Sequence, residues 1–256
     1  MELYVVGCHG GETPKHRAST FILDRTLAID AGAVTRGLDL ADQAKLEACV
    51  VSHAHLDHVR DLATLADNRC QLRSPPLIVA GTKATIRSLK QHFFNGVLWP
   101  DFSVIPCGGG GHTIEFLELD LEKPTMVAGR SVTAVAVSHT IDCAGFVVKT
   151  DSGSIAYSGD TGPTDRLWEV LGGVSDLKAM LVEVSFPDNE GALAKVSGHY
   201  TPASLATDLR KLERSASTPT LLYHIKPIFQ REVERECARL SSFALEVPKL
   251  EDIYQF

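Results

Sequence analysis

The stretch Ser52–Asp61 reads SHAHLDHVRD, and it decides how the rest of the chain is interpreted. It follows the compact apolar run Leu46–Val51 (LEACVV), which is typical of a buried strand. It leads into apolar residues with helical spacing from Val59 to Ala66. A short loop between a strand and a helix presents its side chains at the carboxyl end of a sheet, where functional residues concentrate. We therefore expect this stretch to form part of a functional site.

The stretch combines three imidazoles with one carboxylate, at His53, His55, Asp57 and His58. In an extended backbone His53 and His55 project to the same side, and the next two donors can turn toward the same point from the start of the helix. Neutral imidazole nitrogen and carboxylate oxygen are ligands for zinc and other borderline transition metals. With ten histidines in 256 residues, the pattern HxHxDH arises by chance in on the order of one such chain in a thousand. The competing interpretation is a polar helix cap with incidental histidines.

Four donors in one loop are too many for a single tetrahedral catalytic metal that keeps one position open, so two metals are expected. Further ligands must then come from elsewhere in the chain. Three lone ligand-type residues directly follow predicted strands: His139 in AVAVSHT, Asp160 in IAYSGD and His224 in LLYH. Each by itself could equally be a satisfied polar group of the core. A shared sheet would deliver all three to the edge that carries the loop, and we expect them to complete the site.

The composition limits the partners. The 256 residues carry a formal net charge of -7 and are 44% hydrophobic, which is ordinary for a globular chain. A chain of this length buries roughly 70 to 75% of the surface that its unfolded form exposes, so it needs no metal merely to fold. The negative charge argues against a surface that collects polynucleotide phosphates. It permits a small anionic substrate where a local cation is supplied.

Signals for export and for membrane insertion are missing. Residues 1–7 (MELYVVG) carry an acid where a secretory signal has a basic region, and glycines interrupt the apolar run early. No run approaches the roughly 18 apolar residues of a membrane span. The six cysteines are scattered without a CxxC pair, which favours reduced thiols. We expect a cytoplasmic protein.

The pattern of apolar residues along the chain predicts strands first, then strand–helix units, then more strands, and finally strand–helix units again. Helices are predicted at Lys83–His92 and Thr201–Leu212, and a further strand at Ser103–Pro106. The GGGG run at residues 108–111 lacks the Lys-Ser/Thr that follows in a phosphate-binding loop, and is interpreted as a turn. No linker-like stretch divides the chain. We therefore expect one α/β domain over residues 1–256, with layered sheets and outer helices.

The loop and the three strand-end residues, in this order, resemble the metallo-β-lactamase superfamily, and the resemblance extends to the DAG turn at Asp30–Gly32. It implies an αββα sandwich of two mixed sheets with helices on the outer faces. It also implies two divalent metal ions, held by His53, His55 and His139, and by Asp57, His58 and His224, with Asp160 as the bridge. Zn²⁺ is the expected metal, with Mn²⁺ or Fe²⁺ as alternatives.

Several short motifs, separated in the chain, narrow the resemblance to the class II 3',5'-cyclic nucleotide phosphodiesterases. Seven such motifs occur in the order of that family: HAHLDH (53–58), KATIRSLKQHFFNGVLWPDFS (83–103), SHTIDCAGF (138–146), YSGDTGP (157–163), VEVSFPD (182–188), GHYTP (198–202) and HIKP (224–227). Asp61 departs from that family, in which glycine is common at this position. The resemblance implies hydrolysis of cyclic AMP, cyclic GMP or both to 5'-nucleoside monophosphates, with a bridging hydroxide as the nucleophile.

This chemistry assigns three catalytic residues. Two cations clamp the phosphodiester and lower the pKa of a bridging water, and Asp57 could orient the resulting hydroxide. His199, in the loop GHYTP, is the candidate acid that protonates the leaving 3' oxygen, with an exposed loop histidine as the alternative. Glu183, at a strand end in VEVS, would orient His199 or a ligand imidazole, or else cap the following turn.

Substrate contacts and partners are less specific. The segment Phe93–Phe102 concentrates aromatic residues, so Trp99 could line a nucleobase and Asn95 could read its edge or the ribose, with a core or dimer-contact loop as the alternative. Lys15 and Arg17, in TPKHR, could touch a phosphate or belong to a solvated loop. The expected partner is a small cyclic nucleotide, with no nucleic acid and no membrane, and a homodimer is left open.

Three other functions compete with this one. Ribonuclease Z shares the ligand order and has a Glu and a His at positions like Glu183 and His199, but only twenty residues separate His139 from Asp160, where those enzymes usually carry a tRNA-gripping arm. A thioesterase or lactamase of the same fold would act on a carbonyl. The phosphodiesterase-like motifs at 83–103 and 182–202 argue against such a function. A non-enzymatic metal-binding protein would have a closed site rich in cysteine, unlike this one.

Overall fold

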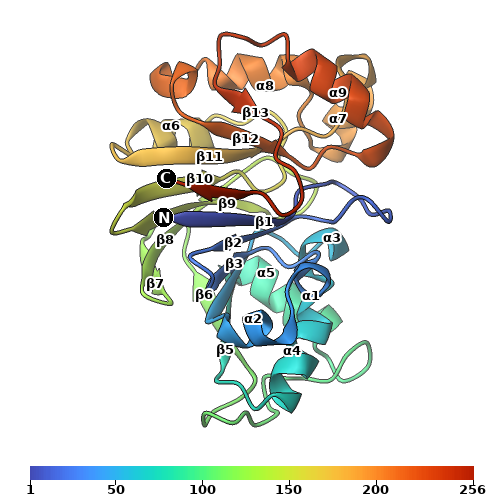
Figure 1. Ribbon diagram of the computed structural model, residues 1–256, viewed down its shortest axis with the longest axis vertical. Coiled ribbons are helices and arrows are strands. Elements are labelled where there is room, and N and C mark those ends of the chain that lie inside the picture. The colour runs from blue at the N-terminus through green and yellow to red at the C-terminus, as the bar shows by residue number, and fades with distance from the viewer.

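The computed structural model describes residues 1–256 as two seven-stranded sheets that face each other, with helices outside both (Figure 1). The N-terminal sheet contains β1 (Glu2–Gly7), β2 (Thr20–Leu23), β3 (Leu27–Ile29), β4 (Ala48–Val51), β5 (Leu77–Thr82), β6 (Ile114–Leu119) and β14 (Ile253–Gln255). The C-terminal sheet contains β7 (Thr125–Val127), β8 (Arg130–Ala136), β9 (Ala144–Thr150), β10 (Gly153–Tyr157), β11 (Leu177–Glu183), β12 (Thr220–Tyr223) and β13 (Leu245–Glu246). The expected αββα sandwich is confirmed.

Helices cover the outer face of each sheet. The N-terminal sheet is covered by α1 (Val34–Gly37), α2 (Leu40–Lys45), α3 (Leu56–Val59), α4 (Leu62–Gln71), α5 (Lys83–Ser88) and the π-helical turn η1 (Leu89–Phe93). The C-terminal sheet carries α6 (Arg166–Gly172), α7 (Gly191–Ser197), α8 (Pro202–Leu209), α9 (Gln230–Cys237) and the 3-10 turns η2 (Asp188–Glu190), η3 (Glu213–Ala216) and η4 (Pro227–Phe229). None of these helices has the length and apolar character that a membrane-spanning helix needs.

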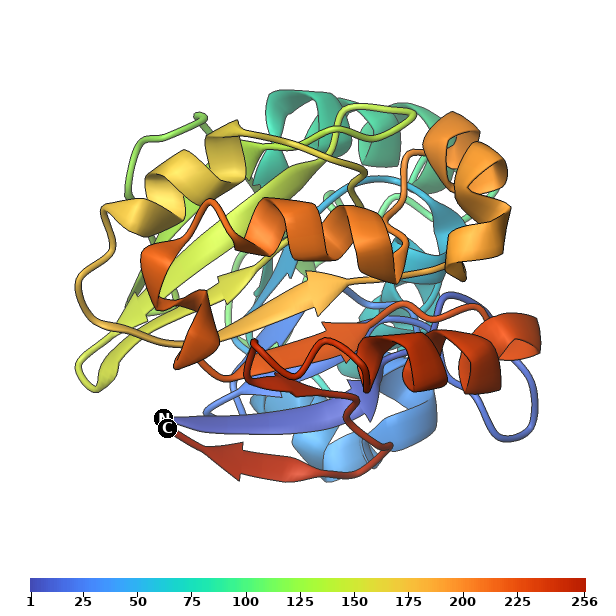
Figure 2. The same cartoon turned by 90° about the horizontal axis from the view of Figure 1, so that it is seen from above.

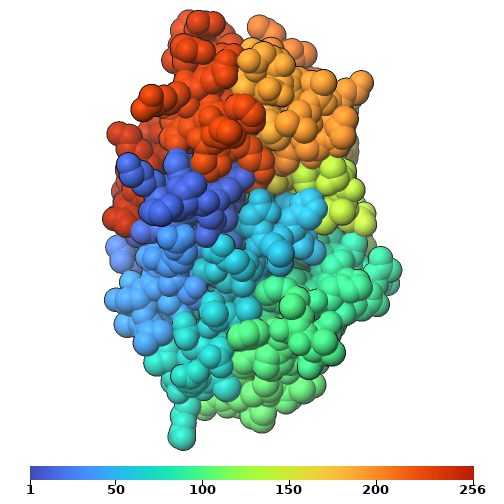
Figure 3. Space-filling view, turned by 90° about the vertical axis from the view of Figure 1, so that its right-hand side faces the viewer, coloured from blue at the N-terminus to red at the C-terminus, as the bar shows by residue number.

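Both sheets are mixed and are built alike. Strands β3, β4, β5 and β6 are parallel to one another, as are β10, β11, β12 and β13, whereas the other pairs are antiparallel. In a parallel sheet the carboxyl ends of the strands share one edge, and ligand sites form there. Figure 3 looks at the right-hand side of Figure 1, where N-terminal, central and C-terminal segments meet on one face. The candidate site lies at this edge.

The core has three layers, as a four-layer sandwich requires. A cluster of 23 buried residues fills the space between the sheets and includes Phe21 from one sheet and Phe146 from the other. A second cluster of 20 residues lies between the N-terminal sheet and its helices, and a third of 17 residues lies under the helices of the C-terminal sheet. The chain ends meet because β14 pairs antiparallel with β1, which places the two termini side by side (Figure 2).

The strand predicted at Ser103–Pro106 is wrong. The Asp101 side chain accepts hydrogen bonds from the Ser103 amide at 3.0 Å and the Ser103 hydroxyl at 2.6 Å, which closes a turn in place of an extended strand. Only Pro106 forms an isolated bridge, to His112. The GGGG run is a turn, as expected, and two of its glycines, Gly110 and Gly111, have positive φ.

Candidate metal centre

The loop after β4 is held by a buried carboxylate from the neighbouring strand. Asp30 follows β3 and lies in the left-handed region, with φ of 55°. One of its oxygens accepts from the Ser52 amide at 2.8 Å, and the other accepts from the Ser52 hydroxyl at 2.8 Å, from Nδ1 of His58 at 2.6 Å and from the Tyr157 hydroxyl at 2.6 Å. Asp30 therefore fixes the start of the loop and directs Nε2 of His58 away from itself.

Sequence reasoning missed this role for Asp30. The available signal was the DAG turn at Asp30–Gly32, because aspartate is one of the few residues that adopt the left-handed region readily. Gly32 is required by close packing, since a Cβ there would lie 2.0 Å from the Asp57 carbonyl oxygen. Asp61 takes part in the same local packing, where it accepts from the amide and the hydroxyl of Thr35 at 2.9 and 2.7 Å.

The three strand-end residues of the C-terminal sheet point at this loop. His139 follows β8, Asp160 follows β10 and His224 follows β12. Asp160 and His224 are 1% exposed, and His53 and His58 are fully buried. Donors from both halves of the chain therefore share one nearly dry space.

The donor atoms form two adjacent groups. In the first, Nδ1 of His55 lies 3.0 Å from Nε2 of His53 and 3.2 Å from Nε2 of His139. In the second, Nε2 of His224 lies 3.4 Å from Nε2 of His58 and 3.4 Å from Oδ2 of Asp57.

Asp160 stands between the two groups. Its Oδ2 lies 3.1 Å from His224 Nε2, 3.2 Å from His58 Nε2 and 3.9 Å from His53 Nε2. Its other oxygen, Oδ1, is buried without any hydrogen-bond partner. One carboxylate thus faces donors of both groups and keeps an oxygen free.

These donors fit metal ions. Ligands at about 2.1 Å from a tetrahedral metal are roughly 3.4 Å apart, and the observed separations lie close to that value. The second nitrogen of four rings is already bonded, to Ser52 Oγ for His53 (3.0 Å), Asp30 for His58 (2.6 Å), the Gly198 carbonyl for His139 (3.0 Å) and Ser185 Oγ for His224 (2.9 Å). Such bonds set the tautomer and leave the inward nitrogen as a lone-pair donor.

The electrostatics of the cluster suit the binding of a cation. Burial lowers the pKa of His53 well below its ordinary value, so this ring is neutral and able to bind a metal. Burial also lowers the pKa of His55, His139 and His224. At Asp160 burial opposes ionisation, but His224 and His58 together hold its pKa well below the ordinary range. At His58 burial opposes protonation, but the carboxylates of Asp160 and Asp30 together raise its pKa well above the ordinary value. The cluster thus combines imidazoles with an ionised carboxylate, the donor set that a borderline divalent metal prefers.

Beside this cluster lies a second group of buried polar side chains. His199 Nδ1 is 2.7 Å from Oε1 of Glu183, and the Ser185 hydroxyl lies 3.1 Å from the other oxygen of Glu183 and 3.3 Å from His199 Nδ1. The His199 ring stacks on His224 with centroids 5.1 Å apart. The predicted orientation of His199 by Glu183 therefore has a short contact in the structure.

Burial acts in opposite directions on this pair. Burial, with the nearby Asp160 charge, raises the pKa of Glu183 to about 8, and burial lowers the pKa of His199 to about 4. The Thr161 amide donates to Glu183 Oε1 at 3.0 Å and helps to fix the carboxyl group. Sequence reasoning missed Ser185, which contacts Glu183, His199 and His224 together and had no signal in the sequence beyond its place two residues after Glu183.

The two residues predicted to contact substrate serve their own loop. The Asn95 side-chain oxygen accepts from the amides of Val97 at 3.0 Å and Leu98 at 2.8 Å, and its nitrogen donates to the Gln91 carbonyl at 3.1 Å. The Trp99 indole donates to the Ala63 carbonyl at 3.0 Å. These contacts shape the loop, and a role of either residue in binding substrate stays a prediction.

The fold and this donor set define a metallo-hydrolase of the lactamase type. The family described as "Beta-lactamase superfamily domain" matches residues 25–225, and the chain belongs to this family. A protein of Yersinia pestis described as "Probable 3',5'-cyclic-nucleotide phosphodiesterase" is 27% identical, over 90% of this chain and 80% of its own length. The "3',5'-cyclic-nucleotide phosphodiesterase" of Aliivibrio fischeri is 28% identical, over 72% of this chain and 66% of its own length.

Relatives with another activity are also similar. A ribonuclease Z of Pyrobaculum calidifontis is 26% identical, over 66% of this chain and 65% of its own. Among solved structures, unliganded yeast PDE1 superimposes with a TM-score of 0.82 over 98% of both chains at 16% identity. The short form of human tRNase Z gives a TM-score of 0.71 over 100% of this chain and 99% of its own, at 17% identity. These structural likenesses establish the fold.

Proposed function

We propose that this protein hydrolyses 3',5'-cyclic nucleotides to 5'-nucleoside monophosphates with the help of two divalent metal ions. The observation that carries the proposal is the arrangement of donors around Asp160, whose Oδ2 faces His53, His58 and His224 at 3.1 to 3.9 Å. The similarity over 90% of the chain to a protein described as a probable cyclic-nucleotide phosphodiesterase supports the substrate class.

The proposed ligands divide as the two groups of donors do. One metal would be held by His53, His55 and His139, a second by Asp57, His58 and His224, and Asp160 would serve both. When bound, the two cations would neutralise the phosphate charge and lower the pKa of a water toward neutrality. Zn²⁺ is the metal we propose, since imidazole and carboxylate are its common ligands, and Mn²⁺ and Fe²⁺ accept the same set.

His199 is proposed to protonate the leaving group. Attack of hydroxide on phosphorus breaks the bond to the 3' oxygen, and that oxygen needs a proton as its charge develops. The raised pKa of Glu183, about 8, and the lowered pKa of His199, about 4, favour the shared proton on Glu183 at neutral pH. His199 then accepts that proton at Nδ1 while it donates the proton on Nε2 to the 3' oxygen.

Asp57 is proposed to orient the attacking hydroxide. It is about one third exposed at its side chain and contacts His224 through Oδ2 at 3.4 Å. An ionised carboxylate at the open side of the cluster can accept a hydrogen bond from the attacking hydroxide and orient it. Burial opposes its ionisation, but the hydrogen bond and charge of His224 and the charge of His58 lower the pKa of Asp57 below its ordinary value.

A cavity of about 260 Å³ beside the loop offers a place for the base. It is lined by Ala54, Leu56, Val59, Ser88, Leu89, His92, Phe93 and Leu98. Ala54 stands in the chain between two proposed ligands, His53 and His55, so a base in this cavity would lie beside the proposed metal centre. A flat purine needs an apolar wall with a few polar groups, and this lining supplies both. Asn95 and Trp99 would then act by shaping the loop that closes it.

Two broader expectations remain proposals. Ligands come from both halves of the chain, between residues 53 and 224, which supports one functional domain over residues 1–256. All six cysteines are free, which supports the proposed cytoplasmic location.

The deciding experiment is a hydrolysis panel with the purified protein loaded with zinc or manganese. We expect cyclic AMP or cyclic GMP to be opened to the 5'-monophosphate, bis(p-nitrophenyl) phosphate to be cleaved, and precursor tRNA to remain intact. Cleavage of precursor tRNA without opening of a cyclic nucleotide would refute the substrate class and favour a ribonuclease Z-type activity. Turnover by the metal-depleted protein would refute the role of the metals.

A further inference from the structure

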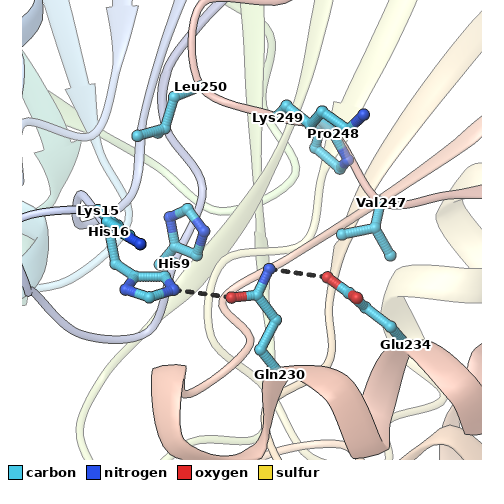
Figure 4. Close-up of a pocket in the computed structure, with 9 residues that line it drawn as sticks. All are labelled: His9, Lys15, His16, Gln230, Glu234, Val247, Pro248, Lys249 and Leu250. Atoms are coloured by element: carbon cyan, nitrogen blue, oxygen red, sulfur yellow. Dashed lines mark hydrogen bonds between the residues drawn. The ribbon is translucent and has the colours of Figure 1, made fainter.

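A second cavity, of about 670 Å³, lies apart from the proposed ligands. The loop after β1, the first turns of α9 and the segment after β13 enclose it, with the lining His9, Lys15, His16, Gln230, Glu234, Val247, Pro248, Lys249 and Leu250 (Figure 4). None of the seven proposed metal ligands lines it. The cavity therefore needs an explanation of its own.

One wall of the cavity is fixed by a chain of hydrogen bonds. Nε2 of His16 donates to the Gln230 side-chain oxygen at 2.7 Å, and the Gln230 nitrogen donates to Glu234 Oε1 at 2.7 Å (Figure 4). The Thr13 hydroxyl contacts Nδ1 of His16, so both nitrogens of that ring are engaged. Hydrogen bonds thus hold the side chains of this wall in place, and neither nitrogen of the His16 ring is free to bind a ligand.

Three nitrogen atoms of the lining have no side-chain partner: the ammonium nitrogens of Lys15 and Lys249 and Nε2 of His9. The ammonium groups of Lys15 and Lys249 form no ion pair, although eleven other lysine and arginine residues do: Arg17, Arg25, Arg36, Lys45, Arg60, Lys123, Arg130, Lys149, Arg166, Lys211 and Arg235. His9, which is 8% exposed, contacts the backbone of Arg17 with Nδ1, and its Nε2 has no hydrogen bond. Glu234 is the one acid of the lining, and its Oε1 already accepts from Gln230.

The opposite wall is apolar. Val247 and Leu250 are half-buried and Pro248 is buried, and all three line the cavity. Two cations against one acid give the lining a net positive charge in a chain of net charge -7. The lining thus combines unpaired positive charge with an apolar surface. The volume is within the range of small-molecule sites.

We propose that this cavity binds an organic phosphate, with the phosphate on Lys15, Lys249 and His9 and the organic body against Val247, Pro248 and Leu250. Lysine ammonium groups bind phosphate as mobile point charges, and the apolar wall adds affinity that a free inorganic ion cannot use. This proposal goes beyond the hydrolytic function, because none of its residues takes part in the proposed reaction.

Backbone hydrogen bonds connect the cavity to the metal centre, between the segment around His9 and the segment that carries His224. The His224 amide donates to the Cys8 carbonyl at 2.8 Å, and the Gly10 amide donates to the Ile225 carbonyl at 3.1 Å, so the residues on either side of His9 support the segment that carries His224. The two sites are therefore neighbours that share no side chain.

The test is calorimetric titration of the zinc-loaded protein with 5'-AMP and, separately, with inorganic phosphate. We expect two equivalents of 5'-AMP to bind, one at the metal centre and one in the cavity, and inorganic phosphate to bind the cavity more weakly. The double variant K15A/K249A should lose the cavity equivalent, with affinity reduced by about tenfold or more, since charge-assisted bonds are removed. The charge-matched control K45A/K123A, which changes two exposed lysines elsewhere, should bind as the parent does.

The outcomes separate this proposal from the proposed function. Retention of both equivalents by K15A/K249A, or a single equivalent that disappears in Asp160→Asn, would overturn the cavity site. A cavity equivalent without a metal-centre equivalent would support the cavity and count against the proposed reaction. Stronger binding of inorganic phosphate than of 5'-AMP in the cavity would overturn the role of the apolar wall. The variant K15R/K249R, which keeps both charges, should restore binding and shows that the loss in K15A/K249A is not a folding defect.

Discussion

Replacement of Asp30 by asparagine should weaken both the fold and the metal centre. The substitution keeps the shape of the side chain, and asparagine tolerates the φ of 55° at this position, so the backbone is not strained further. It removes the charge and turns one acceptor oxygen into a donor. Four donors, the Ser52 amide, the Ser52 hydroxyl, His58 Nδ1 and the Tyr157 hydroxyl, then compete for a single oxygen.

The size of the effect follows from these contacts. The best arrangement turns the amide oxygen toward His58, Tyr157 and the Ser52 hydroxyl, and leaves the buried Ser52 amide facing an NH₂ group. One unsatisfied buried donor costs about 1 to 3 kcal/mol, and loss of the charge on the His58 contact costs about 1 kcal/mol more. The free energy of unfolding should therefore fall by about 2 to 4 kcal/mol. Because Asp30 also orients His58, zinc affinity should fall by about 10- to 100-fold.

Urea unfolding of the metal-depleted protein measures the first effect, since bound metal would add its own stabilisation. Competition with a chromophoric chelator measures the second. The matched control is Asp24→Asn, which changes another aspartate of positive φ, at 46°, that accepts from the Glu2 amide far from the centre. Unchanged zinc affinity in Asp30→Asn, with the control also unchanged, would refute the positioning of His58 by Asp30.

Four further predictions address the centre and its surroundings. Asp160→Asn should abolish turnover and lower the metal content, measured by elemental analysis; full activity would refute the shared role of Asp160. His199→Ala should keep its metal but slow the opening of cyclic AMP by about 10²- to 10⁴-fold, with a smaller loss for bis(p-nitrophenyl) phosphate, whose leaving group needs no proton; equal losses would contradict the acid role. Leu98→Ala should raise the KM for cyclic AMP about three- to tenfold, whereas Val97→Ala, at a neighbour 91% exposed and outside the cavity, should not; equal effects would contradict the base cavity. Burial and the nearby His16 lower the pKa of His9 to about 4, below the unfolded value of about 6.5, so the stability tied to the neutral ring is complete above pH 6.5 and is lost as the pH falls toward 4. The free energy of unfolding should therefore fall between pH 7 and pH 4.5 in both proteins, but by about 2 kcal/mol less in His9→Gln than in the parent. Denaturant titrations at both pH values measure this, and equal falls in the two proteins would contradict the prediction.

Polar residues that come shortly after strands could be predicted to lie at one edge of a sheet, because an isolated polar residue after an apolar run is visible in the sequence. His139, Asp160 and His224 are of this kind, and the structure brings them beside His53 and His58. The αββα layers could be predicted from the order of strand and helix patterns, together with the family resemblance.

The supporting residues could not be predicted, because their roles depend on contacts between segments far apart in the chain. The Tyr157 hydroxyl reaches Asp30 across 127 residues, and Ser185 reaches His224 across 39. Helix α9 was missed for a different reason, since only Val233 and Cys237 of its eight residues are buried and the segment reads as polar. His9 and His16 have no ligand-type neighbours in the sequence, yet His9 is buried and both line the second cavity.

Two residues of the site, Asp30 and His224, adopt the left-handed backbone that non-glycine residues avoid, with φ of 55° and 67°. Each directly follows a strand, β3 and β12, so each marks the point where the chain leaves a sheet at the same edge. Such a conformation costs of order 1 kcal/mol or more and persists only where the surroundings over-determine it. At His224 the amide is bonded to Cys8, the carbonyl to Ser185 at 3.1 Å and Nδ1 to Ser185 at 2.9 Å, so three contacts fix one imidazole. The two turns thus place His58, through Asp30, and His224 beside the same oxygen of Asp160. This explains how sheets from opposite halves of the chain keep their donors within ligand distance of one carboxylate.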